Sequence, residues 1–254
     1  MKAEREKWSG RVTAKALRFQ TGQYELAEEE EICRIILVSG GSFTLVRGGE
    51  SLLVNPGCVL LLGPGLGGTA QSAARATETR TLVQQLLPGF AGAAVLDADG
   101  LNAAAQLLTE GKPFPHPAGE LVVTPHPGEM ARLTGLPAAA LAADREGIAL
   151  RYAKAWNAVV VLKGARTVVA SPDGRVCVNP TGNPGLARGG SGDVLAGMLA
   201  ALLACGLPAY QAAACAVYLH GAAADRAAAK RGEYGMLPHD ILPELGALFA
   251  ENQR

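Results

Sequence analysis

The pattern of apolar and polar positions changes near Gly57. Before this residue, short β-rich runs are separated by glycine turns, which predicts an antiparallel meander. After it, apolar runs alternate with helical segments, and each apolar run ends in a polar loop. We therefore expect a β-rich N-terminal segment over residues 1–57 and a second domain over residues 58–254. The β-rich runs are 32–38, 43–47 and 52–54.

The first run after Gly57, at 58–62, is continuously apolar, as a strand is when both faces of a parallel sheet are covered. Strand, polar loop and helix repeat along this region, which predicts an α/β fold with a doubly wound, mostly parallel sheet flanked by helices. Ligands of such sheets bind beyond the carboxyl ends of the strands, where the polar loops lie. The predicted strands are 58–62, 93–96, 121–124 and 159–162, and the predicted helices are 69–87, a short helix ending at Leu133, and 144–156.

The last third of the chain combines a predicted hairpin with helices. Residues 167–170 and 175–178 read as its two strands, joined by a turn at 171–174. The apolar run 194–204 is too short to cross a bilayer and has the composition of a core helix. Two alanine-rich helices, expected at 209–231 and about 237–250, are suited to cover one face of the sheet.

Charge and cysteine usage narrow the choice of partners and compartment. Lys plus Arg and Asp plus Glu number 23 each, so no overall field attracts nucleic acid or an acidic membrane, and we expect a small-molecule partner. The five cysteines form no C-x-x-C pair and mostly lie in apolar segments, which predicts buried thiols in a reducing compartment. The charged N-terminus has no apolar run typical of a signal peptide. We expect a cytoplasmic protein.

A glycine-rich loop before the apolar run at 194–204 is the strongest candidate for chemistry. Gly189, Gly190, Ser191 and Gly192 are expected to gather free amides at the positive end of a helix, where phosphate oxygens bind. Asp193 falls in the first helical turn, where that field favours an ionised carboxylate able to accept a proton. Phosphoryl transfer to a hydroxyl requires this layout. The alternative is a solvated loop in which Asp193 is an ordinary helix N-cap.

Two basic side chains stand at predicted strand ends. His126 lies between two prolines, which keep the chain extended and hold the imidazole outward at the end of a strand. The side chain either contacts a ligand or satisfies local backbone groups. Lys163 follows an apolar strand, where burying an ammonium group is costly unless an anion pairs with it. It is either a contact to a nucleotide phosphate or a snorkelling surface lysine.

Two further loops have both a structural and a functional interpretation. The glycine-rich loop at 63–67 is either a tight turn or a place where the backbone approaches a flat ligand. Asp97 and Asp99, followed by Asn102, either cap a helix or hold Mg²⁺ through water.

Six short motifs follow one another along the chain: GPGLG at 63–67, LDADGLN at 96–102, TPHPGE at 124–129, VLKGA at 161–165, NPTGNPG at 179–185 and GGSGD at 189–193. Their order and spacing resemble those of the ADP- or ATP-dependent NAD(P)H-hydrate dehydratases, which have a ribokinase-like fold. The likeness covers about residues 58–250, and the first 57 residues do not match. Residues 24–62 are instead weakly similar to the strand-turn-strand run of a cupin-type sensor domain.

This resemblance implies repair of (6S)-NAD(P)H hydrate, with ADP or ATP as co-substrate and Mg²⁺ as cofactor. The nucleotide phosphorylates the C6 hydroxyl, and loss of phosphate restores NAD(P)H. Asp193 would be the base at that hydroxyl, Gly67 and His126 would contact the hydrate, and no residue is assigned as a metal ligand. The implied nucleotide contacts are Lys163, Gly164, Ala165, Arg166 and Thr167, with Gly189, Gly190, Ser191 and Gly192 as the anion hole. Relatives of this kind are commonly homo-oligomers.

Two alternative functions stay open at this point. The Gly-Ser-Gly-Asp loop is common to ribokinase-like kinases. A kinase that acts on another small alcohol is therefore one alternative. The N-terminal segment lacks the glycine-containing loops and alanine-rich helices with which the family holds the nicotinamide half of the hydrate. A non-catalytic nucleotide-binding module is therefore the other alternative.

Overall fold

A computed structural model describes residues 5–6, 16–17, 43–47, 50–54, 60–62 and 73–251 of the chain. The strands are β1 (Arg5–Glu6), β2 (Ala16–Leu17), β3 (Phe43–Arg47), β4 (Glu50–Val54), β5 (Leu60–Leu62), β6 (Ala94–Leu96), β7 (Leu121–Val123), β8 (Val159–Leu162), β9 (Val168–Ala170) and β10 (Val176–Val178). The helices are α1 (Ala73–Gly89), α2 (Ala98–Thr109), α3 (Pro127–Thr134), α4 (Ala138–Ala143), α5 (Arg145–Trp156), α6 (Ser191–Ala204), α7 (Ala209–Arg231) and α8 (Ile241–Glu251), with short 3₁₀ turns η1 (Pro184–Leu186) and η2 (Pro238–Asp240).

A six-stranded sheet in the order β10-β9-β8-β7-β6-β5 forms the centre of the fold. Strands β5 to β8 are parallel, and β9 and β10 form the expected antiparallel hairpin. The mostly parallel α/β sheet predicted from the sequence is confirmed. Because the carboxyl ends of β6, β7 and β8 meet at one edge, their loops bring Asp97, Thr124 and Lys163 together.

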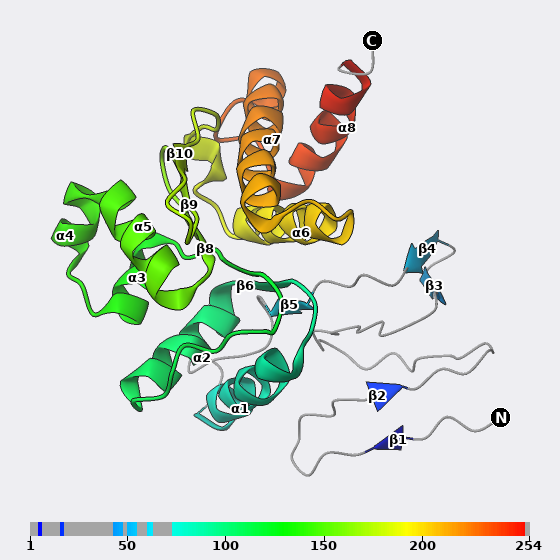
Figure 1. Cartoon of the computed structure of the whole chain (residues 1–254). Helices are drawn as coiled ribbons and strands as arrows, with labels where there is room; N and C mark the ends of the chain where they lie inside the picture. The colour runs from blue at the N-terminus through cyan, green and yellow to red at the C-terminus, as the bar shows by residue number, and fades with distance from the viewer. Residues whose placement is uncertain are drawn as a thin grey trace.

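The continuously apolar strands are explained by helices on both faces of the sheet (Figure 1). Alternate residues of a strand point to opposite faces. Leu96, Val123 and Val160 therefore pack with helices α1 to α5 on one side. Their neighbours Val95 and Val122 pack with α6 and α7 on the other. Helix α8 packs against α7, and Lys230 Nζ lies 2.6 Å from Glu244 Oε1 across that contact.

The described part of the N-terminal segment includes an antiparallel pair, β3 and β4, in which Phe43 faces Val54 and Arg47 faces Glu50. Strands β1 and β2 pair in the same sense. The run predicted as a strand at 32–38 and the boundary expected near Gly57 lie outside the described residues.

Several expectations need correction. Helix α4 was not predicted, whereas α2 begins at Ala98, where one of the two interpretations of Asp97 and Asp99 expected a helix to start. Cys177 and Cys215 are half-buried and Cys205 is exposed, so the three described thiols are not buried in the core. Cys177 lies on the edge strand β10 and Cys205 at the C-cap of α6, where packing is incomplete.

Over the described ranges, no helix combines the length and hydrophobicity of a membrane span.

Candidate active site

The glycine-rich stretch 188–193, called here the anion loop, leads directly into α6. Gly190 is the N-cap of this helix and has φ +91°, a conformation that favours glycine. Asp193 is the third residue of the helix, so its interpretation as the N-cap is wrong. Arg188 fixes the start of the loop, because its Nη1 and Nη2 donate to the carbonyl groups of Met236 (2.7 Å) and Tyr234 (2.9 Å).

The anion loop leaves several donors free. The N–H groups of Gly189, Gly190, Gly192 and Asp193 make no backbone hydrogen bond with any described residue. No described atom lies within 4 Å of the position that a Cβ at Gly189 would occupy. At Gly192, the nearest described atom to that position is Lys163 Nζ, at 3.5 Å. Free amides at a helix N-terminus beside an ammonium group form an environment that suits phosphate.

The Asp193 carboxylate is solvent-accessible and has no hydrogen bond or ion pair with the described residues. Partial burial raises its pKa, the negative charge of Asp97 raises it further, and the Lys163 ammonium group opposes both. The raising causes act against the helix field, which by itself favours the ionised form. A raised pKa makes the carboxylate a better proton acceptor, which suits a general base.

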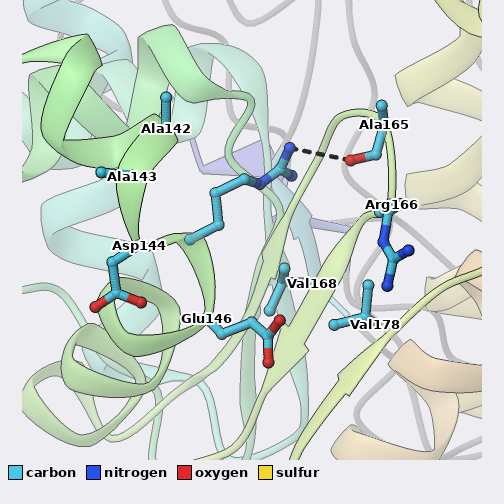
Figure 2. Close-up of a pocket in the computed structure, with 9 residues that line it drawn as sticks. Ala142, Ala143, Asp144, Glu146, Ala165, Arg166, Val168 and Val178 are labelled. Carbon is cyan, nitrogen blue, oxygen red and sulfur yellow. Dashed lines mark hydrogen bonds between the residues drawn. The ribbon is translucent and has the colours of Figure 1, made fainter.

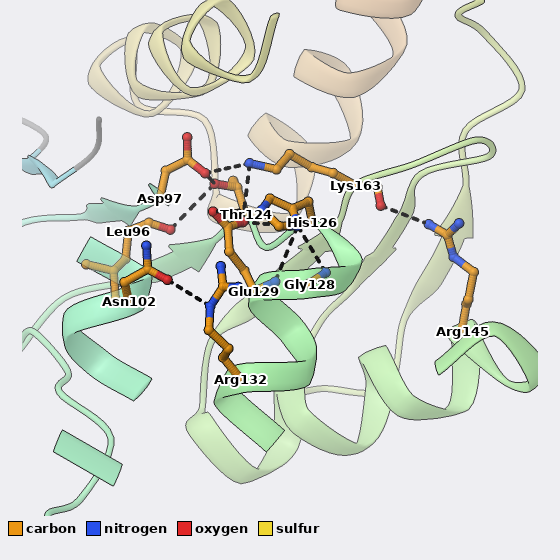
Figure 3. A network of polar contacts seen from close by, with 10 residues as sticks. All are labelled: Leu96, Asp97, Asn102, Thr124, His126, Gly128, Glu129, Arg132, Arg145 and Lys163. Atoms are coloured by element: carbon orange, nitrogen blue, oxygen red, sulfur yellow. Dashed lines mark hydrogen bonds and ion pairs between the residues drawn. The ribbon is translucent and has the colours of Figure 1, made fainter. Parts of the chain in front are cut away.

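Asp97, Thr124, Glu129 and Lys163 form a second group, called here the strand-end cluster (Figure 3). Lys163 Nζ donates to Asp97 Oδ1 at 2.7 Å and lies 3.8 Å from Glu129 Oε2. The Thr124 hydroxyl donates to the same Asp97 oxygen at 2.7 Å. The Asp97 side chain is 1% exposed and makes no cap to α2, although Asp97 occupies the N-cap position. Its interpretation as a side-chain cap is wrong, because its carboxylate is the anion that Lys163 requires.

His126 is the N-cap of α3 and takes part in a reciprocal capping box. Its Nδ1 accepts from the N–H groups of Gly128 (3.0 Å) and Glu129 (3.3 Å), while Glu129 Oε2 accepts from the His126 N–H at 2.7 Å. The imidazole therefore satisfies local backbone groups. It is also 49% exposed, which leaves its outer face accessible to a ligand.

The loop between β8 and β9 contains Gly164, Ala165, Arg166 and Thr167. Gly164 has φ +144° and Arg166 has φ +56°, and the Thr167 hydroxyl donates to the Gly164 carbonyl at 3.0 Å. A cavity of about 440 Å³ lies beside this loop, between the start of α5 and strands β9 and β10 (Figure 2). It includes Ala165 and Arg166 among its lining residues, but neither Lys163 nor Asp193. The cavity therefore lies apart from the anion loop and from the strand-end cluster.

A family model described as NAD(P)H-hydrate dehydratase matches residues 29–246 of the chain. The chain belongs to this family. The match begins at residue 29, so it includes part of the N-terminal segment that we expected not to match.

Relatives of the NAD(P)H-hydrate dehydratase family agree with this assignment. The chain is 54% identical over 164 residues to the bifunctional NAD(P)H-hydrate repair enzyme of Moorella thermoacetica, covering 65% of this chain and 30% of that protein. It is 45% identical over 150 residues to the ADP-dependent (S)-NAD(P)H-hydrate dehydratase of Neisseria meningitidis, covering 59% of this chain and 50% of that one. The chain thus spans half or less of the length of these two relatives.

Solved structures place the fold in the same family. The ADP/ATP-dependent NAD(P)H-hydrate dehydratase of Bacillus subtilis, co-crystallised with ATP and Mg²⁺, aligns with a TM-score of 0.66 and 35% identity. That alignment covers 76% of this chain and 66% of the other. A ribokinase-like superfamily protein of Enterococcus faecalis aligns with a TM-score of 0.61 and 29% identity over 76% of this chain and 63% of its own.

Among the site residues expected from the family resemblance, Lys163, Gly192 and Asp193 lie together, and Gly67 lies outside the described residues. Sequence reasoning missed Thr124, Glu129 and Arg145 as contributors to the site. Glu129 had a readable signal, because a carboxylate three residues after an N-cap is the capping-box spacing. Thr124 opens the TPHPGE motif, but its partner Asp97 could not be predicted, and Arg145 had no signal, since the partners of both residues are distant in sequence.

No cluster of three or more His, Cys, Asp or Glu side chains that could hold a metal ion occurs in the described part of this family member. The carboxylates of Asp193 and Asp97 are close enough for the charge of Asp97 to raise the pKa of Asp193, and Asp97 already binds Lys163. This donor set suits Mg²⁺ only when phosphate oxygens supply further ligands, as this ion commonly binds.

Proposed function

We propose that the chain carries out nucleotide-dependent dehydration of (6S)-NAD(P)H hydrate. The observation that carries the proposal is the Asp193 carboxylate. It is accessible, has a raised pKa and stands beside four main-chain N–H groups without backbone partners among the described residues. Membership of the dehydratase family supports the choice of hydrate as the acceptor.

In the proposed reaction, Asp193 accepts the proton of the C6 hydroxyl while the oxygen of that hydroxyl attacks the terminal phosphorus of ADP or ATP. The bond from that phosphorus to the rest of the nucleotide breaks. In the resulting ester, the C6–O bond then breaks, phosphate leaves with the electrons of that bond, and a proton leaves C5 to restore the C5–C6 double bond. The products are NAD(P)H, phosphate and a nucleotide shortened by one phosphate.

The other residues bind and orient the reactants. Gly189, Gly190, Ser191 and Gly192 supply the anion loop, whose free amides suit the charge that develops on the transferred phosphoryl group. Lys163 adds positive charge near Gly192, and Gly164, Ala165, Arg166 and Thr167 continue the nucleotide site. Gly67 and His126 contact the hydrate. Bound Mg²⁺ supplies charge neutralisation on the nucleotide phosphates.

The decisive experiment compares the chain with Asp193→Asn and with Asp173→Asn, an exposed aspartate in the hairpin turn. We expect phosphate release that requires added hydrate and is matched by recovery of NADH absorbance. Asp193→Asn should lower this rate by about a thousandfold, because a positioned base contributes on that order. Asp173→Asn should leave it unchanged. Turnover without hydrate, or an active Asp193→Asn, contradicts the proposal.

The same assay separates the two alternatives. A stable phosphorylated product from another small alcohol identifies a ribokinase-like kinase. Tight nucleotide binding with no turnover on any alcohol identifies a non-catalytic module.

We further propose a cytoplasmic homo-oligomer with an N-terminal segment at 1–57 and a ribokinase-like domain at 58–254. Light scattering on the purified chain tests the assembly. Limited proteolysis tests whether a boundary lies near residue 57 or nearer residue 29, where the family match begins.

A further inference from the structure

Arg145, the first residue of α5, reaches into the loop that follows β8 (Figure 3). Its Nη2 donates to the carbonyl groups of Leu162 (2.9 Å) and Lys163 (3.3 Å). Its Nη1 donates to the carbonyl of Ala165 at 3.1 Å. Three carbonyl groups of one loop therefore face a single guanidinium group.

This arrangement fixes the direction of the neighbouring N–H groups. A trans peptide group is planar and carries its C=O and N–H on opposite edges, so a carbonyl that faces Arg145 directs the next N–H away from it. The Lys163 N–H is an example, because it donates to the Pro125 carbonyl at 2.9 Å. By the same geometry, the N–H groups of Gly164 and Arg166 point away from Arg145. Neither has a backbone partner among the described residues.

Arg145 is also an unusual residue for holding a loop. Within the described ranges it has no ion-pair partner, and its buried Nε has no hydrogen bond. Burial lowers the pKa of its guanidinium group. The guanidinium group packs closely against Gly164, since a Cβ at this position would lie 2.9 Å from Nη1. Placing an unpaired charge in a partly buried site is costly, so simple loop anchoring does not account for the choice of arginine.

We propose that Arg145 is a positioning residue for the nucleotide: it holds the Gly164 and Arg166 N–H groups ready to donate to phosphate oxygens. Successive free N–H groups in a turn form an anion-binding concavity, and a cation on the adjacent carbonyls polarises the peptide groups and strengthens them as donors. The planar guanidinium fork can serve three carbonyls at once, which an ammonium group on a flexible stem does less well. This inference rests on the proposed function, since it presumes that the loop binds nucleotide.

The test compares Arg145→Lys and Arg145→Met with Arg151→Met, an exposed arginine on the same helix. Titration calorimetry measures binding of ADP with Mg²⁺, and steady-state assays measure KM and kcat. We expect the nucleotide Kd and KM to rise about tenfold in Arg145→Lys and about a hundredfold in Arg145→Met, with kcat at saturation within about threefold. Arg151→Met should match the unaltered chain.

Unchanged nucleotide Kd in both Arg145 variants overturns the inference, even if their unfolding midpoints fall, because that result describes a purely structural anchor. If the unaltered chain binds no nucleotide, the proposed function itself fails. A measurement independent of variant folding is the ¹H–¹⁵N spectrum of the unaltered chain during ADP titration. We expect the Gly164 and Arg166 amide signals to shift along with that of Gly192. Shifts at Gly192 alone would overturn the role of Arg145 while leaving the proposed function intact.

Discussion

The strand-end cluster and the anion loop belong to one candidate site, but they satisfy their polar groups in opposite ways. In the strand-end cluster, Asp97 accepts from both Thr124 and Lys163, and Glu129 accepts from the His126 N–H. Asp97, Thr124 and Glu129 are all buried. These polar groups are paired before any ligand arrives.

The anion loop has free groups instead. Its N–H groups at Gly189, Gly190 and Gly192 have no backbone partner in the described structure, and Asp193 has no ion pair there. The Ser191 hydroxyl is buried without a hydrogen bond in the same described part. Unmade hydrogen bonds of buried groups cost stability. The difference indicates that the cluster is preorganised while the loop is completed by its ligand.

Removing Lys163 should therefore damage the fold, whereas removing Asp193 should not. Lys163→Met leaves the buried Asp97 carboxylate without its cation, so we expect the free energy of unfolding to fall by about 4 kcal/mol. Asp193→Asn should change it by no more than about 0.5 kcal/mol, because Asp193 is exposed and unpaired among the described residues. Urea denaturation measures both, with Lys154→Met on the exposed side of α5 as the control. Equal losses of unfolding free energy in Lys163→Met and Asp193→Asn would contradict the difference between the strand-end cluster and the anion loop.

The fold was predictable where burial alone determines the sequence pattern. The strands β6, β7 and β8 are covered on both faces, so their residues are continuously apolar and could be recognised without the structure. Helix α4 could not be recognised. Only Leu141 of this short helix is buried, so its alanine-rich sequence carries no periodic apolar stripe.

The site was predictable in its parts but not in its connections. The glycines of the anion loop and the strand-end position of Lys163 are local features that the sequence displays. The pairing of Lys163 with Asp97 joins residues 66 positions apart, and local capping rules suggested a different role for Asp97. The raised pKa of Asp193 comes first from partial burial and then from the charge of Asp97, and both depend on residues distant in sequence.

His220 is a buried histidine on α7 and provides a pH-dependent test. Burial lowers the pKa of its imidazole to about 4, and a hydrogen bond with the Ser191 backbone opposes the shift. The folded state therefore keeps His220 neutral, while the unfolded chain binds a proton below about pH 6.5. This contribution to stability is fully present above that pH and decreases as the pH falls towards 4, by about 3 kcal/mol in total.

Unfolding of the unaltered chain, His220→Gln and His239→Gln at neutral and mildly acid pH measures this contribution. His239 is an exposed histidine and serves as the matched control. We expect His220→Gln to lose much of the acid sensitivity that the other two chains share. An equal dependence on pH in all three chains would show that His220 is not held neutral by burial in the folded chain.

Ser191 has the smallest expected effect among the buried groups, and it tests the contrast between paired and free groups on a single hydroxyl. Ser191→Ala removes a buried, unpaired group, so we expect the free energy of unfolding to rise by about 1 kcal/mol without ligand. Ser171→Ala should have the opposite sign, because Ser171 is similarly buried but its hydroxyl hydrogen-bonds with Asp173. If the Ser191 hydroxyl completes its bonding with bound phosphate, ADP with Mg²⁺ should raise the unfolding midpoint less in Ser191→Ala than in the unaltered chain. Destabilisation of Ser191→Ala without ligand would mean that the hydroxyl already has a partner and that this half of the site is as preorganised as the other.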